Sequence, residues 1–262
     1  MNTDPGLLAR AGLPAIDLAS VLGGEPCPLA FATVSGAHLY GFPSQDSDVD
    51  LRGVHVLPAK DLVGLREPEE TRSRMWDHDG VEMDLVTHDL RKFVRLMLKP
   101  NGYVLEQLLS PLVVHSTELH AELASLAPAV VTSNHAHHYR GFAGTQWRLF
   151  WKTGELKPLL YTFRALLTGI HLMRSGTLVA HLPTLLDEVA APAYLPDLIQ
   201  AKAEAEHGPA HLVDAGRASR DIEALHAVLD EAQAGSHLAG APSGFGALHD
   251  LVVRVRLTEQ AS

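Results

Sequence analysis

The sequence lacks the cysteines of a disulfide-stabilised protein and the long apolar stretches of a membrane protein. It contains a single cysteine, Cys27, which excludes an internal disulfide. It shows no charged-then-apolar leader and no apolar stretch of about eighteen residues, so neither a signal peptide nor a membrane-spanning helix is indicated. Among its 16 histidines, the cluster His135, His137 and His138 lacks the i, i+4 pairing with a nearby acid that a helical zinc site would show. We therefore expect a soluble, cytoplasmic protein with no membrane association and no zinc.

Cations are also in short supply, since 21 Lys and Arg face 31 Asp and Glu for a formal net charge of −10. This balance argues against a generally basic nucleic-acid coat, although a local groove stays open. Residues 134–176 are the exception, with six cations against one acid. That segment is predicted to offer an anion site; a solvated helix face is the alternative.

Apolar patterning predicts a mixed fold, because strand-like patterns come early in the chain and helical ones later. Residues 29–34, 49–57 and 81–86 resemble strands, whereas helical periodicity dominates after Pro111. We expect an α/β (α+β) fold, with a small twisted mixed sheet in a domain of residues 1–112 and a helical domain of residues 113–262. Helices after Pro111 are predicted at residues 116–126, 134–151, 158–174, 182–188, 196–206 and 218–233.

Three carboxylates and a glycine turn suggest phosphate chemistry. On an extended strand, Asp48 and Asp50 project to the same side with Cβ atoms about 7 Å apart, where their oxygens can hold Mg²⁺. Gly36, after the first strand, lets backbone amides approach a phosphate. The strand at residues 81–86 adds Asp84 or Glu82, which would complete a two-metal site. A polar strand edge is the alternative for the Asp-x-Asp pair.

Two stretches carry a resemblance to a known family. Residues 35–41, Ser-Gly-Ala-His-Leu-Tyr-Gly, and residues 46–53, Asp-Ser-Asp-Val-Asp-Leu-Arg-Gly, resemble the signature of DNA polymerase beta superfamily nucleotidyltransferases. The His-x-Tyr-Gly spacer and the Asp-Leu-Arg-Gly ending are more specific. They resemble the RNA repair pathway DNA polymerase beta family of predicted nucleotidyltransferases. The resemblance covers roughly residues 29–180.

The resemblance implies an activity and its catalytic residues. An NMP, here AMP, would pass from a nucleoside triphosphate, ATP, to a hydroxyl of an RNA end with release of pyrophosphate. Mg²⁺ or Mn²⁺ would be held by the catalytic residues Asp48, Asp50 and Asp84, with Glu82 as the rival third carboxylate. Nucleotidylylation (AMPylation) of a protein or a small molecule is an alternative. A catalytically silent nucleotide-binding module is another, because Ala37 stands where the family has a serine that Ser35 would have to replace.

Further side chains are expected around the nucleotide. His38 either contacts the nucleotide or holds its own loop, and Arg52 either neutralises the triphosphate or pairs with Asp84. Lys157 and Arg164 are seven residues apart, which places them on one helix face. The predicted nucleotide-binding residues are Ser35, Gly36, Ala37, His38, Tyr40, Arg52, Arg140, Lys157, Tyr161 and Arg164.

Overall fold

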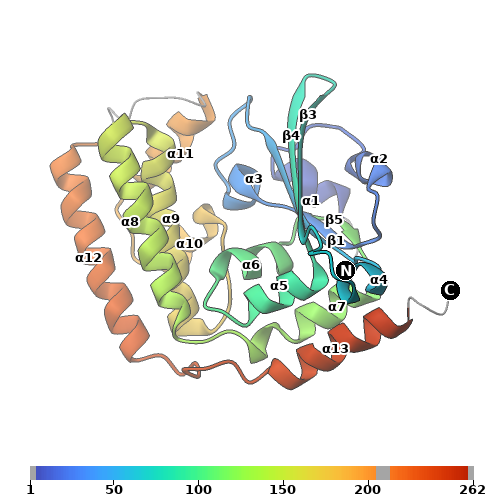
Figure 1. Ribbon diagram of the computed structural model, residues 1–262. Helices are drawn as coiled ribbons and strands as arrows, with labels where there is room; N and C mark the ends of the chain where they lie inside the picture. Colours follow the sequence, from blue (N-terminus) through green and yellow to red (C-terminus); the bar gives the residue numbers. More distant parts are fainter. Residues whose placement is uncertain (1–3, 205–212, 259–262) are drawn as a thin grey trace. The chain divides into compact units, whose positions relative to one another are not determined.

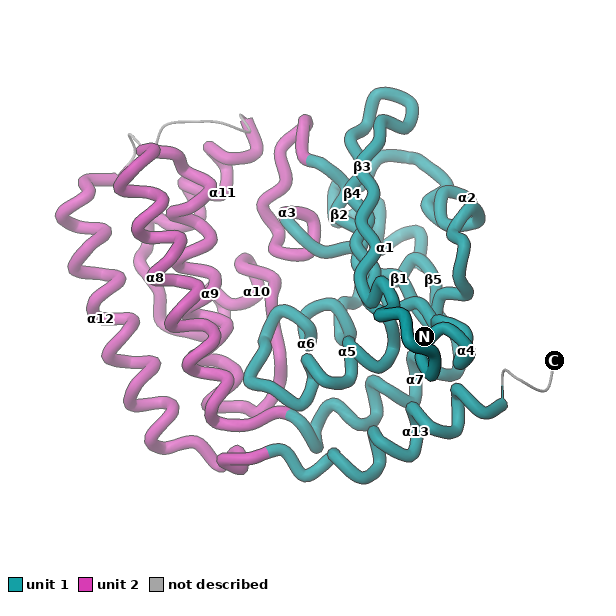
Figure 2. Tube along the Cα trace, viewed as in Figure 1, with its two compact units in different colours: residues 1–36, 48–130, 242–262 teal, residues 37–47, 131–241 magenta. Residues whose placement is uncertain are grey.

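A computed structural model describes residues 4–204 and 213–258. The chain forms two compact units, drawn in different colours in Figure 2. The first, here called the sheet unit, comprises residues 1–36, 48–130 and 242–262, and the second, the helical unit, comprises residues 37–47 and 131–241. None of the helices described within these units is long and apolar enough to cross a membrane.

The sheet unit is built on a five-stranded mixed sheet with the strand order β3-β4-β2-β1-β5 (Figure 1). Strand β1 pairs antiparallel with both β2 and β5, β2 pairs parallel with β4, and β3 pairs antiparallel with β4. The strands are β1 (Leu29–Val34), β2 (Val49–His55), β3 (Thr71–His78), β4 (Val81–Asp89) and β5 (Val113–Ser116). The small mixed sheet, and with it the predicted fold class, is confirmed.

Strand β3 was not predicted, although its turn carries a sequence signal. Asp79 and Gly80 both have positive φ, 54° and 84°, and join β3 to β4 as a two-residue hairpin loop. An Asp-Gly pair favours this turn because glycine adopts positive φ without strain. The strand itself, Thr-Arg-Ser-Arg-Met-Trp-Asp-His, lies at the sheet edge and lacks the apolar alternation of a half-buried strand.

Helices cover the sheet and fill its core. Phe93 of α5 meets Phe31 of β1 edge to face, with ring centroids 5.5 Å apart. The Asp89 carboxylate caps α5 by accepting from the Arg91 N–H at 2.9 Å. The helices of this unit are α1 (Pro5–Arg10), α2 (Leu18–Val21), α4 (Ala59–Val63), α5 (Leu90–Met97), α6 (Gly102–Leu108), α7 (Glu118–Ser125) and α13 (Phe245–Thr258), with short 3₁₀ turns at Leu22–Gly24 and Ala127–Ala129.

The helical unit is organised around α9, in which 15 of 20 residues are buried, so α8, α10, α11 and α12 pack around it. Glycines in the left-handed conformation, Gly154 and Gly176, end α8 and α9. The helices are α8 (His135–Thr153), α9 (Leu156–Ser175), α10 (Leu182–Glu188), α11 (Leu195–Glu204) and α12 (Ala215–Ala234). Each agrees with a predicted helix; the predicted end at Glu206 lies outside the described residues.

The two units differ from the predicted division after residue 112. Strand β5 and helix α7 stay with the sheet, because β5 extends it by pairing with β1. The chain returns to the sheet unit at its end, where the Arg256 guanidinium of α13 donates to the Asp89 carboxylate. Residues 37–47 belong with the helices instead, since the rings of Tyr40 and Phe42 each pack 5.4 Å from that of Tyr161 on α9.

Candidate functional site

The sheet brings two of the three predicted catalytic carboxylates together. Strands β2 and β4 run parallel, and their register places Asp50 directly beside Asp84. Side chains at paired positions project from the same face, and neighbouring strands lie about 4.8 Å apart. The two side chains are 27% and 25% exposed, so both remain open to solvent.

Arg52 binds both of these carboxylates. Its Nη2 donates to Oδ1 of Asp50 at 2.7 Å and to Oδ2 of Asp84 at 2.8 Å. Its Nη1 donates to the backbone carbonyls of Leu51 and Asp84, each at 2.8 Å. Of the two roles predicted for Arg52, the structure shows the pairing with Asp84. The guanidinium therefore fixes the rotamers of two neighbouring acids.

The charge of Arg52 is secured by its surroundings. Burial alone would lower the pKa of this guanidinium, but Asp50, Tyr103 and Asp84 together outweigh that effect and raise the pKa above its ordinary value. Tyr103 lies on α6 and is not among the predicted site residues. Its approach to Arg52 is a tertiary contact, and no local spacing in the sequence signals it.

Gly36 approaches the Asp50 carboxylate closely. It follows β1, where the Ser35 N–H donates to the Asp50 carbonyl at 2.8 Å. Its φ of +62° is in the left-handed region, and a Cβ added there would overlap the Asp50 carboxylate. Instead of the predicted open turn, Gly36 begins a short helix, α3 (Gly36–Tyr40). Ala37 and His38 of that helix are buried.

Asp48 and Glu82 lie outside the Asp50–Asp84 pair. The strand β2 begins at Val49, as its predicted bounds have it, and Asp48 is an exposed residue of the preceding loop, so the strand geometry expected for the Asp48–Asp50 pair does not extend to Asp48. Glu82 is exposed near the hairpin end of β4, opposite Asp77. In their present arrangement, the residues that the structure describes include no group of three or more His, Cys, Asp or Glu side chains that could hold a metal ion.

The predicted nucleotide-binding cations of the helical unit are largely engaged within it. Arg140 of α8 donates to Asp230, and at 3.0 Å to Gln233, both on α12. Arg164 is buried with its guanidinium 3.9 Å from the centre of the Tyr40 ring. Lys157 is half-buried at the start of α9. In this structure Arg140 and Arg164 therefore join elements of the helical unit to one another.

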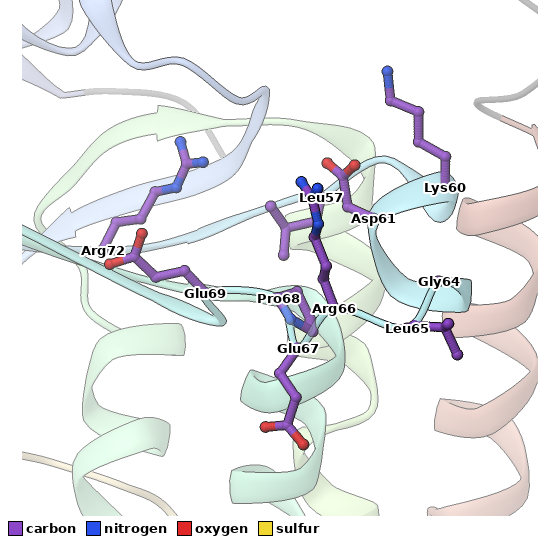
Figure 3. Close-up of a pocket in the computed structure, with 10 residues that line it drawn as sticks. All are labelled: Leu57, Lys60, Asp61, Gly64, Leu65, Arg66, Glu67, Pro68, Glu69 and Arg72. Atoms are coloured by element: carbon purple, nitrogen blue, oxygen red, sulfur yellow. The ribbon is translucent and has the colours of Figure 1, made fainter.

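A pocket of about 530 Å³ lies elsewhere on the sheet unit, between α4 and the start of β3 (Figure 3). Its charged lining mixes three cations and three acids, Lys60, Arg66, Arg72, Asp61, Glu67 and Glu69. None of the predicted site residues lines it. The pocket is therefore not part of the Asp50–Asp84 site.

The five-stranded mixed sheet agrees with a nucleotidyltransferase-like protein of the polymerase beta type, the class to which the sequence comparison assigns the chain. The chain belongs to the RNA repair pathway DNA polymerase beta family, whose sequence profile matches residues 15–254. The resemblance drawn from residues 35–53 is thereby confirmed.

The chain spans about three fifths of the length of the two curated relatives that it matches. The chain is 35% identical over 152 residues to the uncharacterized protein MJ0002 of Methanocaldococcus jannaschii, covering 56% of this chain and 60% of that one. It is 31% identical over 154 residues to the uncharacterized protein YcgL of Bacillus subtilis, covering 57% and 58%. Among solved structures, a nucleotidyltransferase-like protein from Exiguobacterium sibiricum matches with 11% identity and a TM-score of 0.33, over 83% of this chain and 72% of that one.

Proposed function

We propose that this chain transfers an NMP from a nucleoside triphosphate to an acceptor hydroxyl in a metal-dependent reaction that releases pyrophosphate. The observation that carries the proposal is the register pairing of Asp50 and Asp84 beside Gly36, with Arg52 between the carboxylates. We further propose ATP as the donor and an RNA end as the acceptor, since the family is one of RNA repair.

The residues at this point of the sheet fit Mg²⁺ or Mn²⁺. Asp50 and Asp84 offer oxygen donors on neighbouring strands, and the exposed Asp48 lies two residues before Asp50. Such hard oxygen ligands suit magnesium when phosphate oxygens complete its coordination. Because Gly36 has no Cβ, the Asp50 carboxylate can occupy the space that a Cβ there would take. When bound, the ion would offset phosphate charge and acidify the attacking hydroxyl.

The chain's own residues supply orientation and proton transfer. Arg52 holds both carboxylates in place and occupies one oxygen of Asp84, Oδ2. We assign the other oxygen, Oδ1, to accept the proton of the acceptor hydroxyl. The acceptor oxygen then bonds to the α-phosphorus as the bond between that phosphorus and the pyrophosphate oxygen breaks.

Label transfer from α-labelled triphosphates tests the proposal. Wild-type protein with Mg²⁺ or Mn²⁺ is incubated with short RNAs, with no added acceptor, and with small hydroxylated compounds. Asp50→Asn and Asp84→Asn should each lose about 10²–10⁴-fold in rate. Asp46→Asn, an exposed acid of the same run, is the matched control and should transfer like wild type. A wild type that labels nothing above the level of Asp50→Asn overturns the activity; label on the protein itself or on a small compound overturns the RNA acceptor.

One observation favours a second candidate, a nucleotide-binding module without catalysis. The family has a serine at the position of Ala37, and Ser35 would have to replace it. Ser35 is fully buried. Its hydroxyl has no hydrogen-bond partner within the described part of the chain. Ser35 can therefore reach a phosphate only if the backbone after β1 moves. Calorimetric binding of ATP by wild type, with no turnover on any acceptor, is the result that this candidate predicts.

A further inference from the structure

The basic segment at residues 134–176 divides into engaged and exposed cations. Arg140 is bound to Asp230, and Arg164 is buried against Tyr40. Arg148 and Lys152, in contrast, are exposed near the end of α8. Arg148 donates to the Thr145 hydroxyl of its own helix at 3.1 Å. Arg174, at the end of α9, is exposed as well, but the two exposed cations that lie close together on one helix are those at the end of α8.

Aromatic rings lie among these exposed cations. Trp147 stacks on the buried Phe150 with ring centroids 5.1 Å apart and an interplanar angle of 14°. Trp151 stands edge-on to Trp147 at 5.4 Å and 73°, and it is 59% exposed. Leu149 beside it is 41% exposed. Trp147 is thus held by the core, and Trp151 presents a large ring surface to solvent.

The spacing sets the rings and the charges in two adjoining rows. Trp147 and Trp151 are four residues apart, as are Arg148 and Lys152, so each pair follows the helix axis with Cβ atoms about 5–6 Å apart. Helix α8 carries no Asp or Glu. A chain of net charge −10 therefore presents a positively charged stretch that also exposes aromatic surface.

We infer that residues 147–152, here called the tryptophan patch, bind single-stranded RNA. Proteins that hold single strands combine a cationic track for the backbone with aromatic rings on which bases stack. Both features are present here in adjacent rows. The alternative occupant, a second copy of this chain, is an outcome of the test below. The inference rests on the proposed function, because it gives the RNA acceptor a binding surface.

Fluorescence anisotropy of a labelled unstructured RNA of about 12 nucleotides, within the usual range of single-strand sites, tests the patch. The full chain is used without nucleotide or metal. Trp151→Ala should weaken binding about 5- to 150-fold, the loss of one stacked base. Arg148→Gln/Lys152→Gln should make the slope of log affinity against log salt shallower by about 1.4, two phosphate contacts.

Matched variants separate the patch from general surface effects. Phe245→Ala removes an aromatic ring that is 65% exposed on α13, and Lys60→Gln/Arg220→Gln removes two other exposed cations. Both should bind RNA like wild type. Equal binding by wild type and Trp151→Ala, or equal losses in the control variants, overturns the inference. A dimeric wild type that Trp151→Ala converts to monomer also overturns it, because the patch would then join two copies.

The experiment also separates this inference from the proposed function. Asp50→Asn leaves the patch intact, so it should bind RNA as wild type does while losing label transfer. If Trp151→Ala changes neither label transfer to RNA nor the affinity for RNA, the patch is not the RNA-binding surface. The proposed activity then still stands. If wild type binds RNA through the patch but transfers no label, the proposed activity is overturned and the patch stands.

Discussion

Each end of the β2–β4 strand pair carries an aspartate that is paired with an arginine, but the aspartates at the two ends differ in burial. At one end the register pairs Asp50 with Asp84, and Arg52 joins their carboxylates. At the other end it pairs His55 with Asp89, and the Asp89 carboxylate is joined to Arg256 of α13. The first two aspartates are about one quarter exposed, whereas Asp89 is fully buried.

Burial separates a site that can exchange ligands from one that holds elements together. The Asp89 carboxylate also accepts from the N–H groups of Leu57 and Arg91, so it is satisfied entirely by the protein. Breaking a buried ion pair costs far more than breaking an exposed one, because the remaining charge is left without solvent. We therefore expect the open end to control activity and the closed end to control stability.

Removing one aspartate from each end should have the largest and most contrasting effect. Asp89→Ala leaves the Arg256 guanidinium buried without its carboxylate and should lower the free energy of unfolding by about 3–5 kcal/mol. Asp84→Ala at the open end should cost less, because the Arg52 guanidinium keeps the Asp50 carboxylate as a partner. Urea denaturation of both variants measures the difference. Similar losses in the two variants would contradict the contrast between the ends.

The closed end should also make the protein sensitive to acid. Burial, only partly offset by Asp89, lowers the pKa of His55 to about 4. The native state therefore keeps His55 neutral down to about pH 4, whereas the unfolded chain protonates near pH 6.5. The contribution of His55 to the free energy of unfolding is fully present above pH 6.5. It is lost as the pH falls toward 4, at about 1.4 kcal/mol per pH unit.

Replacing His55 checks this slope. His55→Asn should flatten the fall in unfolding free energy between pH 6.5 and 4 by about 1.4 kcal/mol per unit. His135, whose pKa burial also lowers to about 4, is the matched site in the helical unit. A His55→Asn variant that keeps the wild-type slope, measured by denaturation across that range, would show that the closed end does not contribute.

The open end was partly predictable from sequence, and the closed end was not. Alternation along residues 49–57 placed Asp50 and Arg52 on one strand face, which made the Asp84 pairing one of two expected roles for Arg52. The register that sets Asp50 beside Asp84 is tertiary information. The Arg256–Asp89 contact joins residues 167 positions apart, and no local pattern encodes it.

The division of the chain shows the same limit. The helices after residue 134 were predictable because their apolar periodicity is local. That residues 37–47 belong with those helices depends on Tyr40 and Phe42 finding Tyr161 across the sequence. Strand β3 was missed although Asp79-Gly80 signalled its hairpin, because an edge strand needs no apolar face.

A change in stability smaller than that of Asp89→Ala is expected from Gly36, at the open end. Gly36→Ala imposes positive φ on a residue with a Cβ, which costs about 1–2 kcal/mol and should lower Tm by about 2–8 °C. Its Cβ must also displace the Asp50 carboxylate, so label transfer should fall much further than stability.

Gly80→Ala provides the matched comparison for Gly36→Ala. Gly80 has a similar φ of +84°, but a Cβ there would meet no described atom within 4 Å. The backbone cost should therefore be similar while label transfer stays at the wild-type level. Thermal melts and label-transfer rates of the two variants together separate backbone strain from displacement of Asp50. Equal label transfer by both variants would mean that the close approach of Gly36 to Asp50 has no role in the activity.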